Sequence, residues 1–154
     1  MKVFYLDSSA WIKRFCLEKG SDRVAEFFAG GPAVGCSALG LLEVLCTLVR
    51  KTKAGEMDAG DVAAKCREAE RDFELFYQVY LTPALLGRAR VCARRYALRG
   101  ADTLHLASCL EMRQRLAVKH GTVTMVSSDG ELLAGARRCG IETADPEEQP
   151  VPVE

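Results

Sequence analysis

Short runs of strand-forming residues alternate along this chain with longer segments of helical periodicity. The expected strands span residues 2–6, 33–36, 79–81, 122–126 and 141–143, and at least one expected helix separates each strand from the next. Parallel strands need such crossover connections, and the connecting helices cover the faces of the sheet. The alternation therefore predicts an α/β fold with a central, mainly parallel sheet and helices on both faces.

Capping residues and glycines indicate where the helices begin and end. Ser37 is placed to cap one helix, and Thr82 followed by Pro83 is typical of the start of another. We expect Gly100 to end the helix that begins at Pro83. The expected helices span about residues 8–19, 22–29, 38–53, 58–76, 83–99, 101–120 and 131–139.

Length and composition favour one globular domain and disfavour several other classes of protein. The chain has 154 residues, of which 49% are hydrophobic and 27% charged. We expect this domain to span residues 1–144, and residues 145–154, which contain three prolines and three glutamates, to form a loose tail. The 21 basic residues balance the 21 acidic ones, so the net charge gives no reason to expect strong non-specific affinity for nucleic acid or anionic membranes. Any nucleic-acid role must come from local charge placement.

Neither a membrane protein nor a disulfide-rich secreted protein is expected. The longest stretch without a charged residue, 27–42, is interrupted by Gly30, Gly31 and Pro32, and Asp7 comes too early for the apolar core of a signal peptide. The seven cysteines are odd in number and include no Cys-x-x-Cys pair. This pattern argues against a disulfide framework and a thiolate zinc site, and it favours the reducing cytoplasm.

Four acidic residues stand in unusual positions. Asp7 and Asp129 follow expected strands, where an open parallel sheet has its ligand crevice, while Asp102 and Glu43 lie in the first two turns of apolar helices. Each alone has an ordinary structural explanation: an aspartate at a helix N-terminus, or Glu43 paired with an arginine of residues 88–99. Together they would repel one another unless a cation neutralised them. Carboxylates without a His or Cys cluster select Mg²⁺ or Mn²⁺, whose natural chemistry is phosphodiester hydrolysis.

Four motifs in the same order resemble the PIN-domain ribonucleases, especially the VapC-type toxins of toxin–antitoxin pairs. They are Leu6-Asp7-Ser8-Ser9-Ala10, Ser37-x-Leu39-x-x-x-Glu43, Gly100-Ala101-Asp102-x-Leu104-His105-Leu106-Ala107 and Ser127-Ser128-Asp129-x-x-Leu132. The resemblance extends from the first expected strand to Ile141. It implies a single PIN-like domain whose acidic tetrad is Asp7, Glu43, Asp102 and Asp129.

The resemblance also implies roles and partners. Asp7, Glu43 and Asp102 would hold the principal metal, and Asp129 would complete the site or help to hold a second ion. Ser8 and Ser127 match the hydroxyl positions that support these acids. The implied reaction is the hydrolysis of RNA by water to leave a 5′-phosphate. The implied partners are an antitoxin that blocks the groove and a second copy of the chain.

Other residues and other functions remain open from the sequence. His105 shares a helical face with Asp102, but a lone histidine in an apolar segment is more often packed and hydrogen-bonded than catalytic. Lys13 and Arg14 are candidate phosphate contacts, whereas the arginines of residues 88–99 are expected to form a solvated face. The alternatives to a toxin are a housekeeping PIN nuclease in RNA processing, a catalytically inactive PIN scaffold and a phosphoacceptor-like domain. The last is disfavoured because the first strand ends in only one acid.

Overall fold

The central sheet of the protein is entirely parallel. The computed structural model describes residues 1–148, and the remaining residues, 149–154, are left out of the description. The strands are β1 (Lys2–Leu6), β2 (Ala33–Ser37), β3 (Tyr77–Val79), β4 (Thr122–Val126) and β5 (Glu142–Ala144). They lie in the order β3-β2-β1-β4-β5, and each neighbouring pair is parallel. This confirms the predicted α/β fold.

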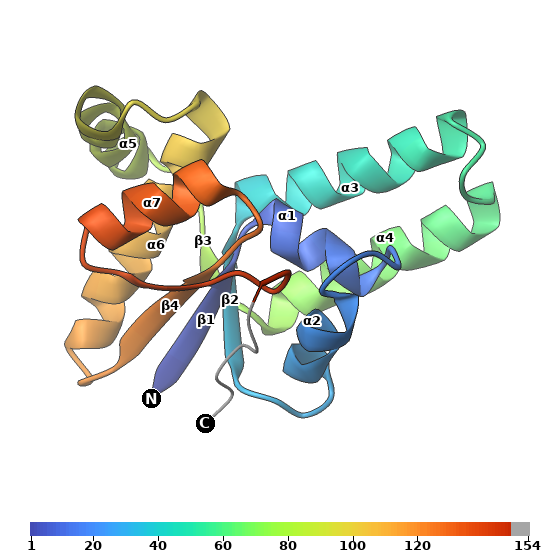
Figure 1. Cartoon of the computed structure of the whole chain (residues 1–154), viewed down its shortest axis with the longest axis horizontal. Coiled ribbons are helices and arrows are strands. Elements are labelled where there is room, and N and C mark those ends of the chain that lie inside the picture. The colour runs from blue at the N-terminus through green and yellow to red at the C-terminus, as the bar shows by residue number, and fades with distance from the viewer. Residues whose placement is uncertain (149–154) are drawn as a thin grey trace.

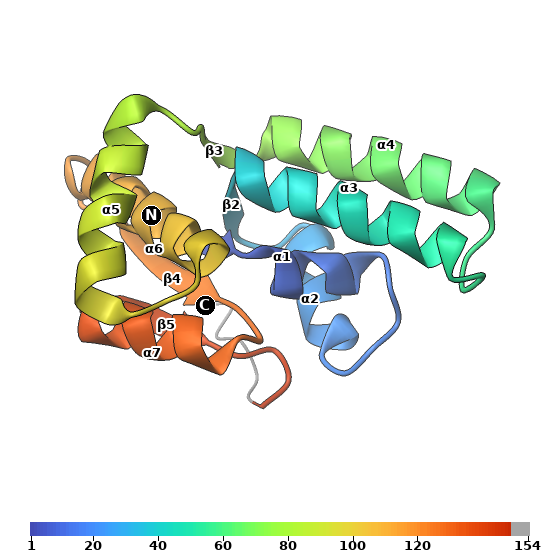
Figure 2. The ribbon, with the colours of Figure 1, turned by 90° about the horizontal axis from the view of Figure 1, so that it is seen from above.

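The helices form two groups on opposite sides of the sheet (Figures 1 and 2). The first group contains α1 (Ser8–Trp11), a 3₁₀ turn η1 (Ile12–Arg14), α2 (Ser21–Phe28), α3 (Ala38–Lys53) and α4 (Ala59–Leu75). The second contains α5 (Pro83–Tyr96), α6 (Gly100–Ala117) and α7 (Gly130–Arg138). The long helices α3 and α4 lie side by side and extend well beyond the sheet (Figure 2).

Strand β1 separates two hydrophobic cores because its successive side chains point to opposite faces. Phe4 and Leu6 pack in the core with the helices of the first group, whereas Val3 and Tyr5 pack in the core with those of the second. All four side chains are at most 1% exposed. Strands buried on both faces are characteristic of parallel sheets. Because all the strands run in the same direction, their carboxyl ends lie at one edge of the sheet.

Most helix boundaries follow the sequence prediction, and the hydroxyls of Ser37 and Thr82 cap α3 and α5 as expected. The first helix was predicted to reach residue 19, but it tightens into η1 and ends at Arg14. The reason lies in the loop that follows: the Oγ of Ser21 donates to the carbonyl of Cys16 and accepts from the N–H of Glu18. These bonds fix a turn where the helix would have continued.

Two further boundaries differ from the prediction. Gly100 was expected to end α5, but it opens α6, while α5 ends before Ala97, which has a left-handed φ of 53°. The left-handed residue redirects the chain so that Leu98 packs close to Gly135 of α7. Strand β3 lies two residues earlier than expected, with Val79 as its last residue, paired with Ser37 of β2.

The remaining predictions concern cysteines, membranes and the C-terminus. All seven cysteines are free thiols, and four of them are buried. Among residues 1–148, the structure contains no helix with the length and apolar character needed to cross a membrane. Of the expected tail, the structure describes residues 145–148, where Pro146 accepts from Arg23 and Glu147 accepts from Lys13. The expectation for residues 149–154 lies outside the described part of the chain, and the proposed domain limit at residue 144 stays a prediction.

Candidate active site and metal centre

Asp7 lies at the carboxyl end of β1, at the centre of the sheet edge. Its Oδ1 accepts from the backbone N–H of Ala10 at 3.0 Å, so the carboxylate caps α1. Its Oδ2 accepts from Ser127 Oγ at 2.7 Å, and Ser9 Oγ lies 2.8 and 2.9 Å from the two carboxylate oxygens. The side chain is buried, and burial raises its pKa, although nearby His105 and the hydrogen bonds from Ser127, Ala10 and Ser9 oppose that change.

Two serine hydroxyls join the loop after β1 to the loop after β4. Ser127 Oγ donates to Asp7 and accepts from the N–H of Asp129 at 2.9 Å, while Ser9 Oγ accepts from the N–H of Ser128 at 2.9 Å. The sequence prediction named Ser8 as the first supporting hydroxyl. In the described residues, Ser9 and not Ser8 bonds to Asp7. The sequence did contain a signal for Ser9. An aspartate that caps a helix turns the residues that follow it back toward its own carboxylate.

Asp129 and Asp102 lie near this same edge. Asp129 caps α7, where its Oδ1 accepts from the N–H of Leu132 at 2.9 Å. Asp102 lies in the first turn of α6 and is half-buried. Its pKa is raised first by burial and then by the negative charges of Asp129 and Asp7, whereas His105 and Arg99 oppose that change. Three of the four predicted acids are therefore near enough to act on one another electrostatically.

Glu43 joins the edge from α3 through a hydrogen bond to a histidine. His105 Nε2 lies 2.6 Å from Glu43 Oε1, and His105 Nδ1 lies 2.9 Å from the phenol oxygen of Tyr5. The partner of Glu43 is thus this ring and not an arginine of residues 88–99, the structural alternative considered for it. His105 is packed and hydrogen-bonded, as the sequence indicated, and only 1% exposed.

The donor chemistry at this edge suits a hard divalent cation. Within residues 1–148, no Lys or Arg side chain makes an ion pair with Asp7, Asp102 or Asp129. The negative charges of Asp129 and Asp7 contribute to the raised pKa of Asp102. Mg²⁺ or Mn²⁺ bound among these acids would relieve that repulsion. The acids lie along the same edge of the sheet but are not gathered around one point. Among the described residues, no three His, Cys, Asp or Glu side chains are close enough together to hold a metal ion as they stand. Their assignment as metal ligands stays a prediction.

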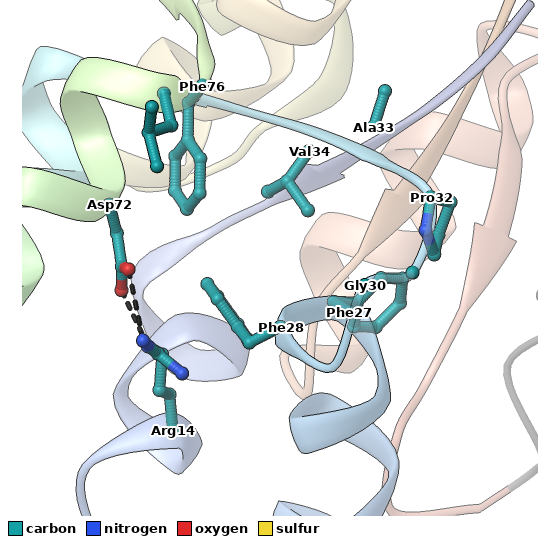
Figure 3. Close-up of a pocket in the computed structure, with 11 residues that line it drawn as sticks. Arg14, Phe27, Phe28, Gly30, Pro32, Ala33, Val34, Asp72 and Phe76 are labelled. Atoms are coloured by element: carbon teal, nitrogen blue, oxygen red, sulfur yellow. Dashed lines mark hydrogen bonds and ion pairs between the residues drawn. The ribbon is translucent and has the colours of Figure 1, made fainter.

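The two predicted phosphate contacts are already engaged in ion pairs. Lys13, whose side chain is only 4% exposed, contacts Glu147 at 2.6 Å and Glu18 at 3.3 Å. Arg14 holds Asp72 through its Nε at 2.6 Å and its Nη2 at 3.1 Å, as Figure 3 shows. Neither side chain offers a free charge to a phosphate, so these contacts give no support to an RNA-binding role.

A cavity of about 400 Å³ lies beside Arg14, at the beginning of β2 (Figure 3). Its walls include Phe28, Phe76 and Val34, and its polar group is the Arg14–Asp72 pair. None of the four acids lines it. The acidic edge and this cavity lie at opposite ends of β2, so the cavity is not part of the candidate active site.

Comparison with known proteins agrees with this geometry. The family model described as PIN domain matches residues 4–134. Ribonuclease VapC45 of Mycobacterium tuberculosis is 32% identical over 148 residues, which cover 94% of this chain and 96% of that protein. The structure of M. tuberculosis VapC20, a toxin that cleaves the sarcin–ricin loop, superposes with a TM-score of 0.61 and 18% identity, covering 85% of this chain and 93% of that one.

A toxin–antitoxin complex from Klebsiella pneumoniae has the same fold. It superposes with a TM-score of 0.57 and 14% identity, over 94% of this chain and 98% of that one. The sequence motifs, the parallel sheet with its acidic carboxyl edge and the match to VapC45 over nearly its whole length lead to one conclusion. This chain belongs to the PIN domain family.

Proposed function

We propose that this protein is a metal-dependent endoribonuclease that acts as the toxin of a toxin–antitoxin pair. The observation that carries the proposal is the acidic edge of the sheet, where Ser127 joins Asp7 to the backbone of Asp129. Asp102 lies near enough that burial and then the charges of Asp129 and Asp7 raise its pKa. Acids from three separate parts of the chain lie close to one another without a basic partner in the described structure. The relationship to Ribonuclease VapC45 supports RNA as the substrate.

The family resemblance implies a separate role for each of the four acids. Asp7, Glu43 and Asp102 would hold the principal cation, and Asp129 would complete the site or help to hold a second ion. Mg²⁺ or Mn²⁺ bound there would supply a Lewis acid for the phosphodiester and an activated water as its nucleophile. Ser127 and Ser9 hold the Asp7 carboxylate through its oxygens, so that its orientation is set before substrate arrives.

Arg99 is better placed than Lys13 or Arg14 to contact RNA. It directly precedes α6, and its charge acts on Asp102, which sets it near the acidic edge. In the described part of the chain, Arg99 has neither an ion pair nor a side-chain hydrogen bond, and it is exposed. An exposed, unpaired guanidinium beside the acids is suited to an RNA phosphate.

Two protein partners belong to the same proposal. An antitoxin is supported by the shared fold with the K. pneumoniae complex. A homodimer is implied by the family resemblance and stays a prediction. We place the protein in the cytoplasm, which the seven free thiols favour.

Induced expression in a bacterial host tests this function without a guess about the substrate. Wild-type protein and Asp102→Asn would be compared for growth and for new 5′-phosphate ends across all cellular RNA. We expect growth arrest and discrete new ends with the wild type and neither with the variant. Asp58→Asn serves as a matched control, because Asp58 is an exposed helix cap at the start of α4.

The other outcomes separate the alternatives. New ends without arrest would favour a housekeeping nuclease. Normal growth and no new ends with the wild type would favour an inactive scaffold. Arrest by the wild type and Asp102→Asn alike would mean that the acids are not the cause of toxicity.

A further inference from the structure

A chain of two hydrogen bonds links Tyr5, His105 and Glu43 inside the protein. The Tyr5 phenol oxygen lies 2.9 Å from His105 Nδ1, and His105 Nε2 lies 2.6 Å from Glu43 Oε1. Tyr5 is fully buried and His105 is 1% exposed, while the Glu43 side chain keeps 31% of its surface accessible. The chain of hydrogen bonds therefore runs from the core to the acidic edge of the sheet.

These three residues come from the elements that carry three of the candidate metal ligands. Tyr5 lies in β1, two residues before Asp7, and His105 lies in α6, three residues after Asp102. Glu43, in α3, is itself the third ligand. The histidine ring thus connects β1, α3 and α6 near the sheet edge at which Asp7 and Asp102 lie.

The direction of the hydrogen bonds follows from what each group can donate. An ionised carboxylate only accepts, so His105 Nε2 carries the proton that is shared with Glu43. When the ring carries this one proton, Nδ1 accepts, and the donor is the hydroxyl of Tyr5. Oε1 of Glu43 is thereby occupied, and within the described chain its Oε2 has no hydrogen-bond partner.

Close packing holds the ring in this orientation. The rings of His105 and Tyr5 pack edge to face, with the ring centroids 6.0 Å apart and the planes at 73°. On α3, one turn before Glu43, Gly40 lies against the other side of the site: a Cβ at that position would lie 3.4 Å from His105 Cε1, an ordinary contact, and would collide with the Sγ of Cys36. The ring is therefore confined by β1 on one side and by α3 on another.

We propose that His105 is a positioning residue that holds Glu43 by Oε1 and thereby presents Oε2 to the catalytic cation, with Tyr5 selecting the tautomer that makes this possible. The inference deepens the proposed function and rests on it, because it assumes that Glu43 is a metal ligand. A histidine that orients a ligating carboxylate changes metal affinity without touching the metal, and loss of such a support typically lowers affinity ~10–100-fold.

Two amide substitutions of His105 separate positioning from packing. In His105→Gln the amide nitrogen reaches the place of Nε2 and still donates to Glu43, whereas in His105→Asn the shorter amide reaches only the place of Nδ1. We expect Mn²⁺ affinity, measured by titration calorimetry, to fall by ~10–100-fold in His105→Asn and to change much less in His105→Gln. Melting temperatures of the metal-free variants record any purely structural loss. Equal Mn²⁺ affinity in His105→Asn and His105→Gln would overturn the proposal.

A double mutant tests whether His105 acts through Glu43. In a Glu43→Ala background, we expect His105→Asn to cause no further loss of Mn²⁺ affinity, because no carboxylate is left for His105 to hold. Losses that simply add would show that His105 does not act through Glu43. If the wild-type protein binds no Mn²⁺, the metal site of the proposed function is wrong. The contact between His105 and Glu43 would then position no metal ligand.

A measurement on the metal-free protein examines the hydrogen bonds themselves. Nitrogen-15 spectra of the histidine rings should show His105 with a protonated Nε2 and an accepting Nδ1. Tyr5→Phe should reduce the preference for this tautomer, and Glu43→Gln should shift the Nε2 proton. If Glu43→Gln leaves the ring signals unchanged, the contact between His105 and Glu43 does not exist in solution and the inference fails, whatever the metal titrations give.

Discussion

Ser127 Oγ donates a 2.7 Å hydrogen bond to Oδ2 of Asp7, across a sequence separation of 120 residues. The parallel register makes this contact possible, because Leu6 of β1 pairs with Val126 of β4, so the next residue of each strand emerges at the same level. A buried carboxylate needs such donors, since burial without them is costly. The bond gives Asp7 a defined orientation at the centre of the acidic edge.

Divalent metal should stabilise the wild-type protein more than Asp7→Asn. At a Mn²⁺ concentration 100 times the dissociation constant, binding adds about 2.7 kcal/mol to the free energy of unfolding, or roughly 5–10 °C in a domain of this size. Asn can still cap α1, so the variant should fold but lose this gain. Thermal unfolding with and without Mn²⁺ measures the effect. Asp58→Asn changes only the exposed N-cap of α4 and should keep the full gain. An equal gain in Asp7→Asn would place the metal elsewhere.

The stability of the metal-free protein should fall as the pH rises from about 4 toward neutrality. The pKa values of Asp7 and Asp102 are raised in the folded chain from an ordinary value of 3.8. Between the ordinary and the raised pKa the folded state binds more protons than the unfolded state, so the free energy of unfolding decreases with pH. Asp102→Asn should therefore raise the melting temperature more at pH 7 than at pH 4, measured in a chelator. If Asp102→Asn raised the melting temperature equally at pH 4 and pH 7, this result would contradict the like-charge repulsion at this edge.

Substitution of Arg99 should weaken RNA binding in a salt-dependent way, whereas that of Lys13 should not. One phosphate contact to a single strand contributes about 0.7 to the slope of log affinity against log salt concentration. We expect Arg99→Met, in an Asp7→Asn background that prevents cleavage, to lower the slope by about that amount. Lys13→Met should leave the slope unchanged, because Glu147 and Glu18 already neutralise Lys13. Fluorescence anisotropy with a labelled RNA over a salt series gives both slopes. A reduced slope for Lys13→Met would restore the role that the sequence suggested for it.

Two glycine-to-alanine changes in helices should have opposite effects on stability. A Cβ at Gly40 would collide with the Sγ of Cys36, which is fully buried, so Gly40→Ala should cost about 1–3 kcal/mol. Gly87 lies in α5 with nothing within 4 Å of an added Cβ, and Gly87→Ala should add about 0.5–1 kcal/mol. Urea denaturation of both variants checks the pair. A Gly40→Ala protein as stable as the wild type would mean that α3 can move away from β2 and from His105.

The sequence predicted the elements that depend on short-range information. Alternating strands and helices, the hydroxyl caps of α3 and α5 and the extent of α3 all follow from periodicity and from residues within a few positions of each helix end. The same reasoning predicted that Asp7 and Asp129 follow parallel strands. Errors occurred where a distant contact or an unusual backbone angle intervened, as in the turn fixed by Ser21 and the left-handed Ala97.

By itself, then, the sequence determined the α/β class, the order of the elements and the four acids worth considering, because strand and helix periods and caps are local properties. Only the tertiary structure decided which groups form hydrogen bonds with these acids and which groups neutralise the candidate RNA contacts. His105 reaches Glu43 across 62 residues, and Glu147 reaches Lys13 across 134. Such pairs depend on how whole elements pack, and a buried hydrogen-bonding or charged group takes whichever partner that packing brings within reach.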